Sequence, residues 1–78
     1  MSWLDFQEAP RPHGYKTRRW DVLSKQGGIC VGTVSWYAPW RRYAFTPGEG
    51  MVFDADCLRE LGAFCGEQTD AHRKAKTA

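Results

Sequence analysis

The alternation of aromatic and small residues between positions 29 and 46 is the feature that most constrains the fold. By the two-residue period of a β-strand, one side of the strand predicted over 29–37 carries Cys30, Gly32, Val34 and Trp36. We expect this side to face the core. The pair Ala38-Pro39 interrupts the pattern, because proline has no N–H to donate to a sheet. The alternation resumes over 40–46, so the sequence predicts an aromatic β-hairpin.

A further strand is predicted before this hairpin. Over residues 15–24, Trp20 and Val22 fall on one face. The segment that follows ends in Gly27 and Gly28, which suit a tight turn because glycine readily adopts a positive φ. The predicted strands therefore follow one another as an antiparallel meander.

A helix is predicted after the turn at Pro47–Gly50. Asp54 is a good N-cap, so the helix begins at Asp54 or Ala55. Phe53, just before the cap, is placed to form a hydrophobic staple with Leu58. Because Gly62 and Gly66 each lower helix propensity by about 1 kcal/mol relative to alanine, we expect the helix to end between Cys65 and His72.

The predicted core lies between this helix and the hairpin. Leu58, Leu61 and Cys65 recur at helical spacing and form an apolar stripe that faces the sheet. On the sheet side, alternation assigns the partners Trp36, Tyr43 and Phe45.

These patterns predict one α+β domain, a three-stranded antiparallel β-meander packed against one C-terminal α-helix. Residues 1–14 are interpreted as an irregular N-terminal arm, since Pro10, Pro12 and Gly14 break regular structure. Residues 15–70 form the β-β-β-α domain, and 71–78 a basic C-terminal tail. A chain of 78 residues is close to the size at which one core becomes marginal. We expect the aromatic side chains to supply its stability.

A cytoplasmic location is predicted. The three cysteines, Cys30, Cys57 and Cys65, are odd in number and follow no secreted disulfide framework. The first residues lack the charged region followed by an apolar region that is typical of a signal peptide. No apolar run approaches the roughly 20 residues that span a bilayer.

Charge is unevenly distributed along the chain, although the net charge is only +2. Between residues 48 and 70, six acidic residues stand against Arg59 alone, whereas Arg41 and Arg42 are the only charges between 29 and 47. Further basic groups occur at 11–19 and 73–76. We therefore expect a basic sheet side and an acidic helix side. Each cluster taken singly is also typical of ordinary solvated surface.

No catalytic or metal-binding constellation is found, so we expect neither an enzyme nor a cofactor. The cysteines include no Cys-x-x-Cys pair, and on one helix Cys57 and Cys65 lie about 12 Å apart, too far to share a zinc ion. We interpret the thiols as buried small hydrophobes. His13 and His72 stand in no motif that orients a base.

Several segments together resemble a set of small uncharacterised proteins encoded by phages and prophages. They are Leu23-Ser24-Lys25, the run Gly32-Thr33-Val34-Ser35-Trp36-Tyr37-Ala38-Pro39-Trp40-Arg41-Arg42-Tyr43-Ala44-Phe45, and Val52-Phe53-Asp54-Ala55-Asp56-Cys57-Leu58-Arg59-Glu60. The resemblance covers about residues 16–69 and implies no activity. It implies a context in which short accessory proteins act by stoichiometric binding, including the blocking of host defence complexes such as CRISPR effectors.

Three functions are considered. The leading hypothesis is a non-enzymatic inhibitor, similar in action to anti-CRISPR proteins, that binds a host or phage protein complex as a monomer or homodimer. Its predicted binding residues are Tyr37, Trp40, Arg41 and Arg42 on the hairpin and Glu60 and Glu67 on the helix. The second is a nucleic-acid-binding module with a basic aromatic sheet, since Arg42-Tyr43-Ala44-Phe45 resembles part of an RNA-recognition signature. The third is a structural or scaffold protein.

Overall fold

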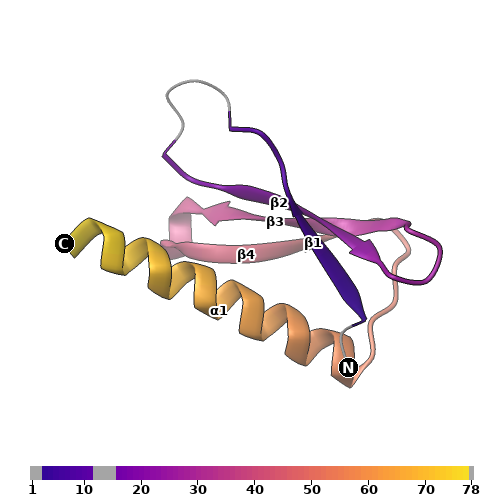
Figure 1. Ribbon diagram of the computed structural model, residues 1–78. Helices are drawn as coiled ribbons and strands as arrows, with labels where there is room; N and C mark the ends of the chain where they lie inside the picture. The colour runs from indigo at the N-terminus through magenta and orange to yellow at the C-terminus, as the bar shows by residue number, and fades with distance from the viewer. Residues whose placement is uncertain (1–2, 12–15, 78) are drawn as a thin grey trace.

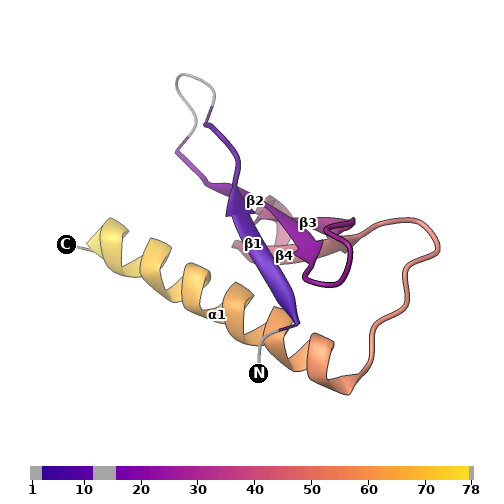
Figure 2. The same ribbon diagram turned by 45° about the vertical axis from the view of Figure 1, so that its right-hand side comes forward.

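Four antiparallel strands and one long helix form the domain (Figure 1). The computed structural model describes residues 3–11 and 16–77, the side chains of 76 and 77 excepted. The strands are β1 (Leu4–Glu8), β2 (Arg19–Ser24), β3 (Cys30–Tyr37) and β4 (Arg42–Pro47), and they lie in the order β1-β2-β3-β4. The helix, α1 (Ala55–Thr77), lies across one face of this sheet (Figure 2). The α+β class and the antiparallel sheet with one C-terminal helix are as predicted.

The sheet has four strands, so the prediction of three strands with an irregular N-terminal arm was wrong. Leu4–Glu8 pairs with β2, with Leu4 opposite Ser24 and Phe6 opposite Val22. The breaking residue Pro10 lies beyond the end of this strand, while Pro12 and Gly14 lie outside the described residues. Leu4 and Phe6 alternate with polar residues, and their apolar side meets the core.

The connections differ in how well they match the sequence pattern. Gly27 and Gly28 have φ of 84° and 67°, which confirms the predicted turn. The predicted third strand begins two residues later than expected, because Ala38–Trp40 forms a 3₁₀ turn with Pro39 in its first positions. Arg41 follows with φ of 52°, the left-handed region.

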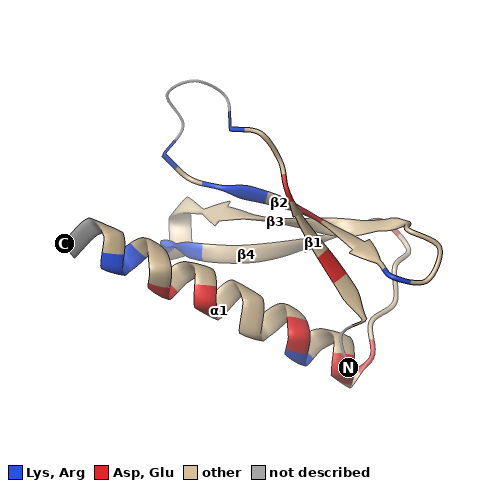
Figure 3. Cartoon of the chain, viewed as in Figure 1, with Lys and Arg blue, Asp and Glu red and all other residues tan. Residues whose placement is uncertain are grey.

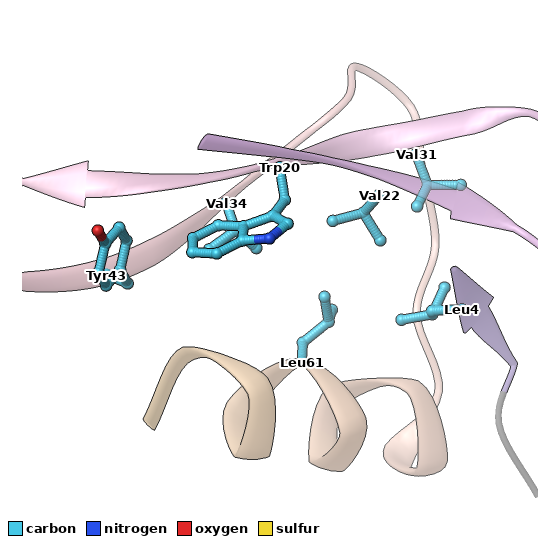
Figure 4. Close-up of a cluster of buried hydrophobic side chains, with 7 residues drawn as sticks. All are labelled: Leu4, Trp20, Val22, Val31, Val34, Tyr43 and Leu61. Atoms are coloured by element: carbon cyan, nitrogen blue, oxygen red, sulfur yellow. The ribbon is translucent and has the colours of Figure 1, made fainter. Parts of the chain in front are cut away.

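The core lies between the sheet and α1 (Figure 4). Its buried members are Leu4, Trp20, Val22, Val31, Val34, Tyr43 and Leu61. Val31 replaces the predicted Cys30, which is exposed. The cause is a β-bulge: Val22 pairs with Gly32 and Leu23 with Cys30, so Val31 has no partner residue on β2 and the alternation is reset. The thiol of Cys30 is therefore not the buried small hydrophobe that the sequence predicted.

Aromatic rings of the sheet contact aromatic rings of the helix directly. Phe6 stacks on Phe64 at 3.9 Å between centroids, and Trp20 meets Phe64 edge-on at 5.0 Å. The predicted core partners Trp36, Tyr43 and Phe45 all pack in or against the core, as does Leu61. Leu58, however, is 55% exposed, so its assignment to the core stripe was wrong. Phe53 packs on Phe45 at 5.3 Å.

The helix begins as predicted and extends further than predicted. Asp54 is the N-cap, and its Oδ1 accepts a hydrogen bond of 2.9 Å from the Cys57 N–H. The helix continues through Gly62 and Gly66 to Thr77, and so includes the segment that the sequence assigned to a basic tail. Tertiary contacts near its end explain the difference, because the His72 ring lies 4.5 Å from Trp36.

Two glycine substitutions should have opposite effects on stability. A Cβ at Gly32 would lie 2.5 Å from a ring carbon of Phe45 and against the backbone oxygen of Thr46. Gly32→Ala should therefore lower the free energy of unfolding by about 1–3 kcal/mol. A Cβ at Gly62 on α1 meets nothing within 4 Å. Gly62→Ala should raise the free energy of unfolding by up to about 1 kcal/mol, because alanine has a higher helix propensity than glycine. Urea denaturation of both variants tests the pair, and equal effects would contradict the assigned packing.

The cap makes stability depend on pH. The hydrogen bond from the Cys57 N–H lowers the pKa of Asp54 below its usual range. Protonation therefore costs more in the folded state, and stability is lost as pH falls below the ordinary Asp value of about 3.9. Asp54→Asn keeps the cap without a titrating group. The melting temperature of the natural chain should fall relative to that of Asp54→Asn as the pH is lowered below about 4. Parallel profiles would contradict the assignment.

Candidate functional site

Four of the predicted binding residues lie together where β3 turns into β4. Trp40 is 65% exposed and Tyr37 is 44% exposed, and their rings meet edge-on at 4.8 Å between centroids. Arg41 and Arg42 follow directly and are also exposed. This group is called the aromatic–arginine cluster: Tyr37, Trp40, Arg41 and Arg42.

The backbone of the 3₁₀ turn determines where these side chains point. The Arg41 N–H donates to the Ala38 carbonyl at 3.2 Å, which closes the turn and places Arg41 in its left-handed conformation. The Arg42 Nε donates to the Trp40 carbonyl at 3.3 Å. Two guanidinium groups and an indole are thus held at one tip of the sheet.

Other basic residues converge on the same end of the molecule. Because the strands are antiparallel, the start of β2 lies beside the end of β3, with Arg19 opposite Ser35. The C-terminal half of α1 lies there too, since the Tyr43 N–H donates to Thr69 at 3.0 Å. Figure 3 shows Lys and Arg at the starts of β2 and β4 and at the end of α1. This basic end comprises Arg11, Lys16, Arg18, Arg19, Arg41, Arg42, Arg73 and Lys74.

One arginine of the basic end has a structural role. Arg18 makes two hydrogen bonds with the Glu8 carboxylate, of 2.8 and 2.6 Å, and its guanidinium lies 4.9 Å from the centre of the Trp20 ring. The hydrogen bonds with Glu8 raise the pKa of Arg18 and lower the pKa of Glu8. The Glu8 carboxylate therefore offsets part of the charge of Arg18.

Two hollows lie at the basic end, and Arg42 of the aromatic–arginine cluster lines one of them. The first, of about 450 Å³, lies where β2 and β3 meet the segment after β1, and its lining includes Arg11, Arg18, Arg19, Asp21, Ser35 and Trp36. The second is a groove of about 340 Å³ between β4 and α1, whose lining includes Arg42, Arg73, Asp70 and Thr69. Each hollow carries more cations than carboxylates, so each suits an anionic group.

The helix continues beyond the acidic stretch that the sequence predicted, so the predicted acidic helix side ends in basic residues. Asp54 caps α1, and Asp56 and Glu60 lie in its first two turns, while Arg73 and Lys74 lie near its end. The helix itself therefore carries both signs. This arrangement agrees with the helix dipole, which favours acids near the N-terminus and bases near the C-terminus.

The two predicted acidic binding residues lie on α1 and are not part of the aromatic–arginine cluster. Glu60 accepts hydrogen bonds from the N–H groups of Trp3, at 3.1 Å, and Leu4, at 2.8 Å, and so attaches the start of β1 to α1. Glu67 is exposed on α1, about two turns beyond Glu60. Sequence reasoning recorded the basic groups at 11–19 and 73–76 separately but did not join them to Arg41 and Arg42. The predicted meander places 15–19 beside 37–42 and could have revealed that part.

Cys57 and Cys65 pack against the core, whereas Cys30 is exposed. Burial raises the pKa of the Cys65 thiol, and burial together with Asp54 raises the pKa of the Cys57 thiol. Both thiols are therefore poor nucleophiles near neutral pH. Over residues 3–11 and 16–77, no three His, Cys, Asp or Glu side chains gather as a metal site.

The fold and the site together define a small α+β domain with a basic end that carries exposed aromatic side chains. The chain is similar to the "Uncharacterized 9.3 kDa protein" of Acholeplasma phage L2, with 28% identity over 72 residues that cover 92% of this chain and 91% of the phage protein. The predicted resemblance to small phage-encoded proteins is thereby confirmed. No known protein family and no solved structure matches the chain. In the part of the chain that the structure describes, no helix has the length and apolar character needed to cross a membrane.

Glycine substitution should affect stability differently at the two neighbouring arginines, because only Arg41 has a left-handed backbone. An L residue in this region costs roughly 1 kcal/mol, which glycine avoids. Arg41→Gly should therefore leave the free energy of unfolding unchanged or raise it by up to about 1 kcal/mol. Arg42→Gly removes the same charge from strand β4 and should lower it by about 1 kcal/mol. Thermal unfolding of both variants is the measurement. If Arg41→Gly loses as much stability as Arg42→Gly, the assigned backbone strain at Arg41 is contradicted.

Proposed function

We propose that the protein is a non-enzymatic binding module that binds single-stranded nucleic acid through its basic end. The observation that carries this proposal is the exposed Tyr37–Trp40 ring pair within a surface of converging arginines and lysines. Cations supply contacts with phosphates, and exposed rings supply contacts with bases.

The cations support the phosphate part of the proposal. Arg41 and Arg42 lie where the 3₁₀ turn meets β4, Arg19 begins β2 beside the end of β3, and Arg73 lies across a groove from Arg42, so all lie at one end. A polyanion that crosses this end contacts several of them at once. Binding then releases counterions, so affinity falls steeply with salt.

The rings favour a single strand over a duplex. Stacking on a protein ring needs a base whose face is free, and bases within a duplex are already stacked on their neighbours. Trp40 stands on the 3₁₀ turn beyond the end of the sheet, where its exposed ring can meet an unpaired base. Base–aromatic stacking contributes about 1–3 kcal/mol per base.

A protein partner is the second candidate, because exposed Trp, Tyr and Arg side chains are also typical anchors of protein interfaces. In this alternative the aromatic–arginine cluster binds an acidic surface of a host defence complex, and the protein inhibits that complex stoichiometrically, as anti-CRISPR proteins do. The similarity to a phage protein supports this context. The two candidates differ in whether a bare oligonucleotide binds.

The binding of short oligonucleotides tests the proposal. Fluorescence anisotropy should show that a labelled DNA single strand of about 12 nucleotides binds more tightly than the corresponding duplex. Trp40→Ala should weaken single-strand binding by about 5- to 100-fold, with little effect on the duplex. Trp3→Ala is the matched control, since Trp3 is 44% exposed near the start of α1 and outside the basic end.

A charge variant completes the same experiment. The double variant Arg41→Gln/Arg42→Gln should weaken binding to both oligonucleotides. For the single strand, the slope of log K against log salt concentration should become shallower by about 0.7 for each phosphate contact that is lost. Lys25→Gln, in the turn between β2 and β3, should leave both unchanged. If neither oligonucleotide binds at low salt, nucleic-acid binding is rejected and the protein partner is left as the candidate.

A further inference from the structure

The end of the molecule opposite the basic end carries exposed apolar side chains around a hollow. Val52 is 94% exposed and Trp3 is 44% exposed. Both line a hollow of about 290 Å³, whose floor includes Leu4, Val31 and Phe53. For comparison, a cavity of about 150 Å³ accommodates a benzene ring. The hollow is therefore large enough to receive one aromatic side chain.

Carboxylates lie in and next to this hollow. Asp54 lines it directly, and Trp3 also lines a neighbouring open hollow together with Asp56, Arg59 and Glu60. Arg59 forms an ion pair with Asp56, and Glu60 holds the N–H groups of Trp3 and Leu4. Lys25 also lies here, since its N–H donates to the Trp3 carbonyl at 3.2 Å. Three carboxylates thus stand against two cations, and the surface remains acidic. We call this surface the acidic hollow: Trp3, Val52, Phe53, Asp54, Asp56 and Glu60.

The chemistry of the acidic hollow indicates its occupant. It fits an aromatic side chain that is followed by cations. That combination is present on this chain, at the other end, where the exposed Trp40 is followed by Arg41 and Arg42. Two ends of one molecule are therefore complementary in both charge and apolar character.

We propose that the protein associates with itself head to tail, with Trp40 of one copy in the acidic hollow of the next. Arg41 and Arg42 then lie beside Asp54 and Asp56 of that second copy. The contact joins two different surfaces, so it is heterologous and can continue into longer chains. This inference does not depend on nucleic-acid binding.

The properties of the contact follow from its size and charge. One side chain in one hollow makes a small interface, at the weak end of the range for specific association. Exposed ion pairs at its rim are screened by salt, so association weakens as ionic strength rises. A single-stranded oligonucleotide that occupies Trp40 should also dissociate the chains.

Sedimentation velocity of complementary variants tests the proposal. The natural chain should show a sedimentation coefficient that rises between about 10 µM and about 1 mM at low salt. Trp40→Ala lacks the inserted side chain, and Val52→Lys places a cation in the hollow, so each variant alone should remain monomeric. Their mixture should form a heterodimer and nothing larger, because only one functional head and one functional tail remain.

Each alternative result contradicts the proposal. A monomeric natural chain at every concentration rejects self-association. A symmetric dimer at the acidic hollow would be lost in Val52→Lys and kept in Trp40→Ala, and the mixture would then show no heterodimer. Because Val52 is almost fully exposed, the substitution should leave the melting temperature unchanged. Oligonucleotide binding at low concentration should not be weakened in Val52→Lys, which separates this result from a failure of the proposed function.

Discussion

Tyr43 is the side chain on which the arrangement of the other elements depends. Its buried ring meets both Trp20 of β2 and Trp36 of β3 edge-on, each at 5.3 Å. Its hydroxyl accepts a hydrogen bond of 3.0 Å from the Arg18 N–H, and its own N–H donates to Thr69 on α1. The Thr69 hydroxyl in turn donates to the Cys65 carbonyl. One residue of an edge strand is thus joined to two other strands and to the helix.

This junction explains why the basic end exists. Thr69 and the ring contact between Trp36 and His72 hold the C-terminal half of α1 beside the starts of β2 and β4. The helix therefore brings Arg73 to the end where the aromatic–arginine cluster lies. The same orientation places Asp54 and Glu60 at the opposite end, where Glu60 attaches β1. Packing of one helix in one direction thus produces a molecule with unlike ends.

Local signals were sufficient for much of the fold and for the centre of the candidate site. The Asp54 cap, the glycine turn and the exposure of Trp40 beside Pro39 follow from residues close together in the chain. Strand β1 was missed because its five residues form a strand only by pairing with β2. The exposure of Leu58 and Cys30 was missed because helical and strand periods show only which residues share a face. The sheet edges and a bulge decide which of those residues are buried.

The sequence by itself determined the class of the domain, the start of the helix and the group of exposed residues that follows Pro39. These depend on backbone preferences and periods that operate over a few residues. Only the tertiary structure decided that β1 completes the sheet, that α1 continues to Thr77, and that cations from four parts of the chain share one end. The physical reason is that these features arise from contacts between residues far apart in the chain, such as Glu60 with Leu4 and Thr69 with Tyr43.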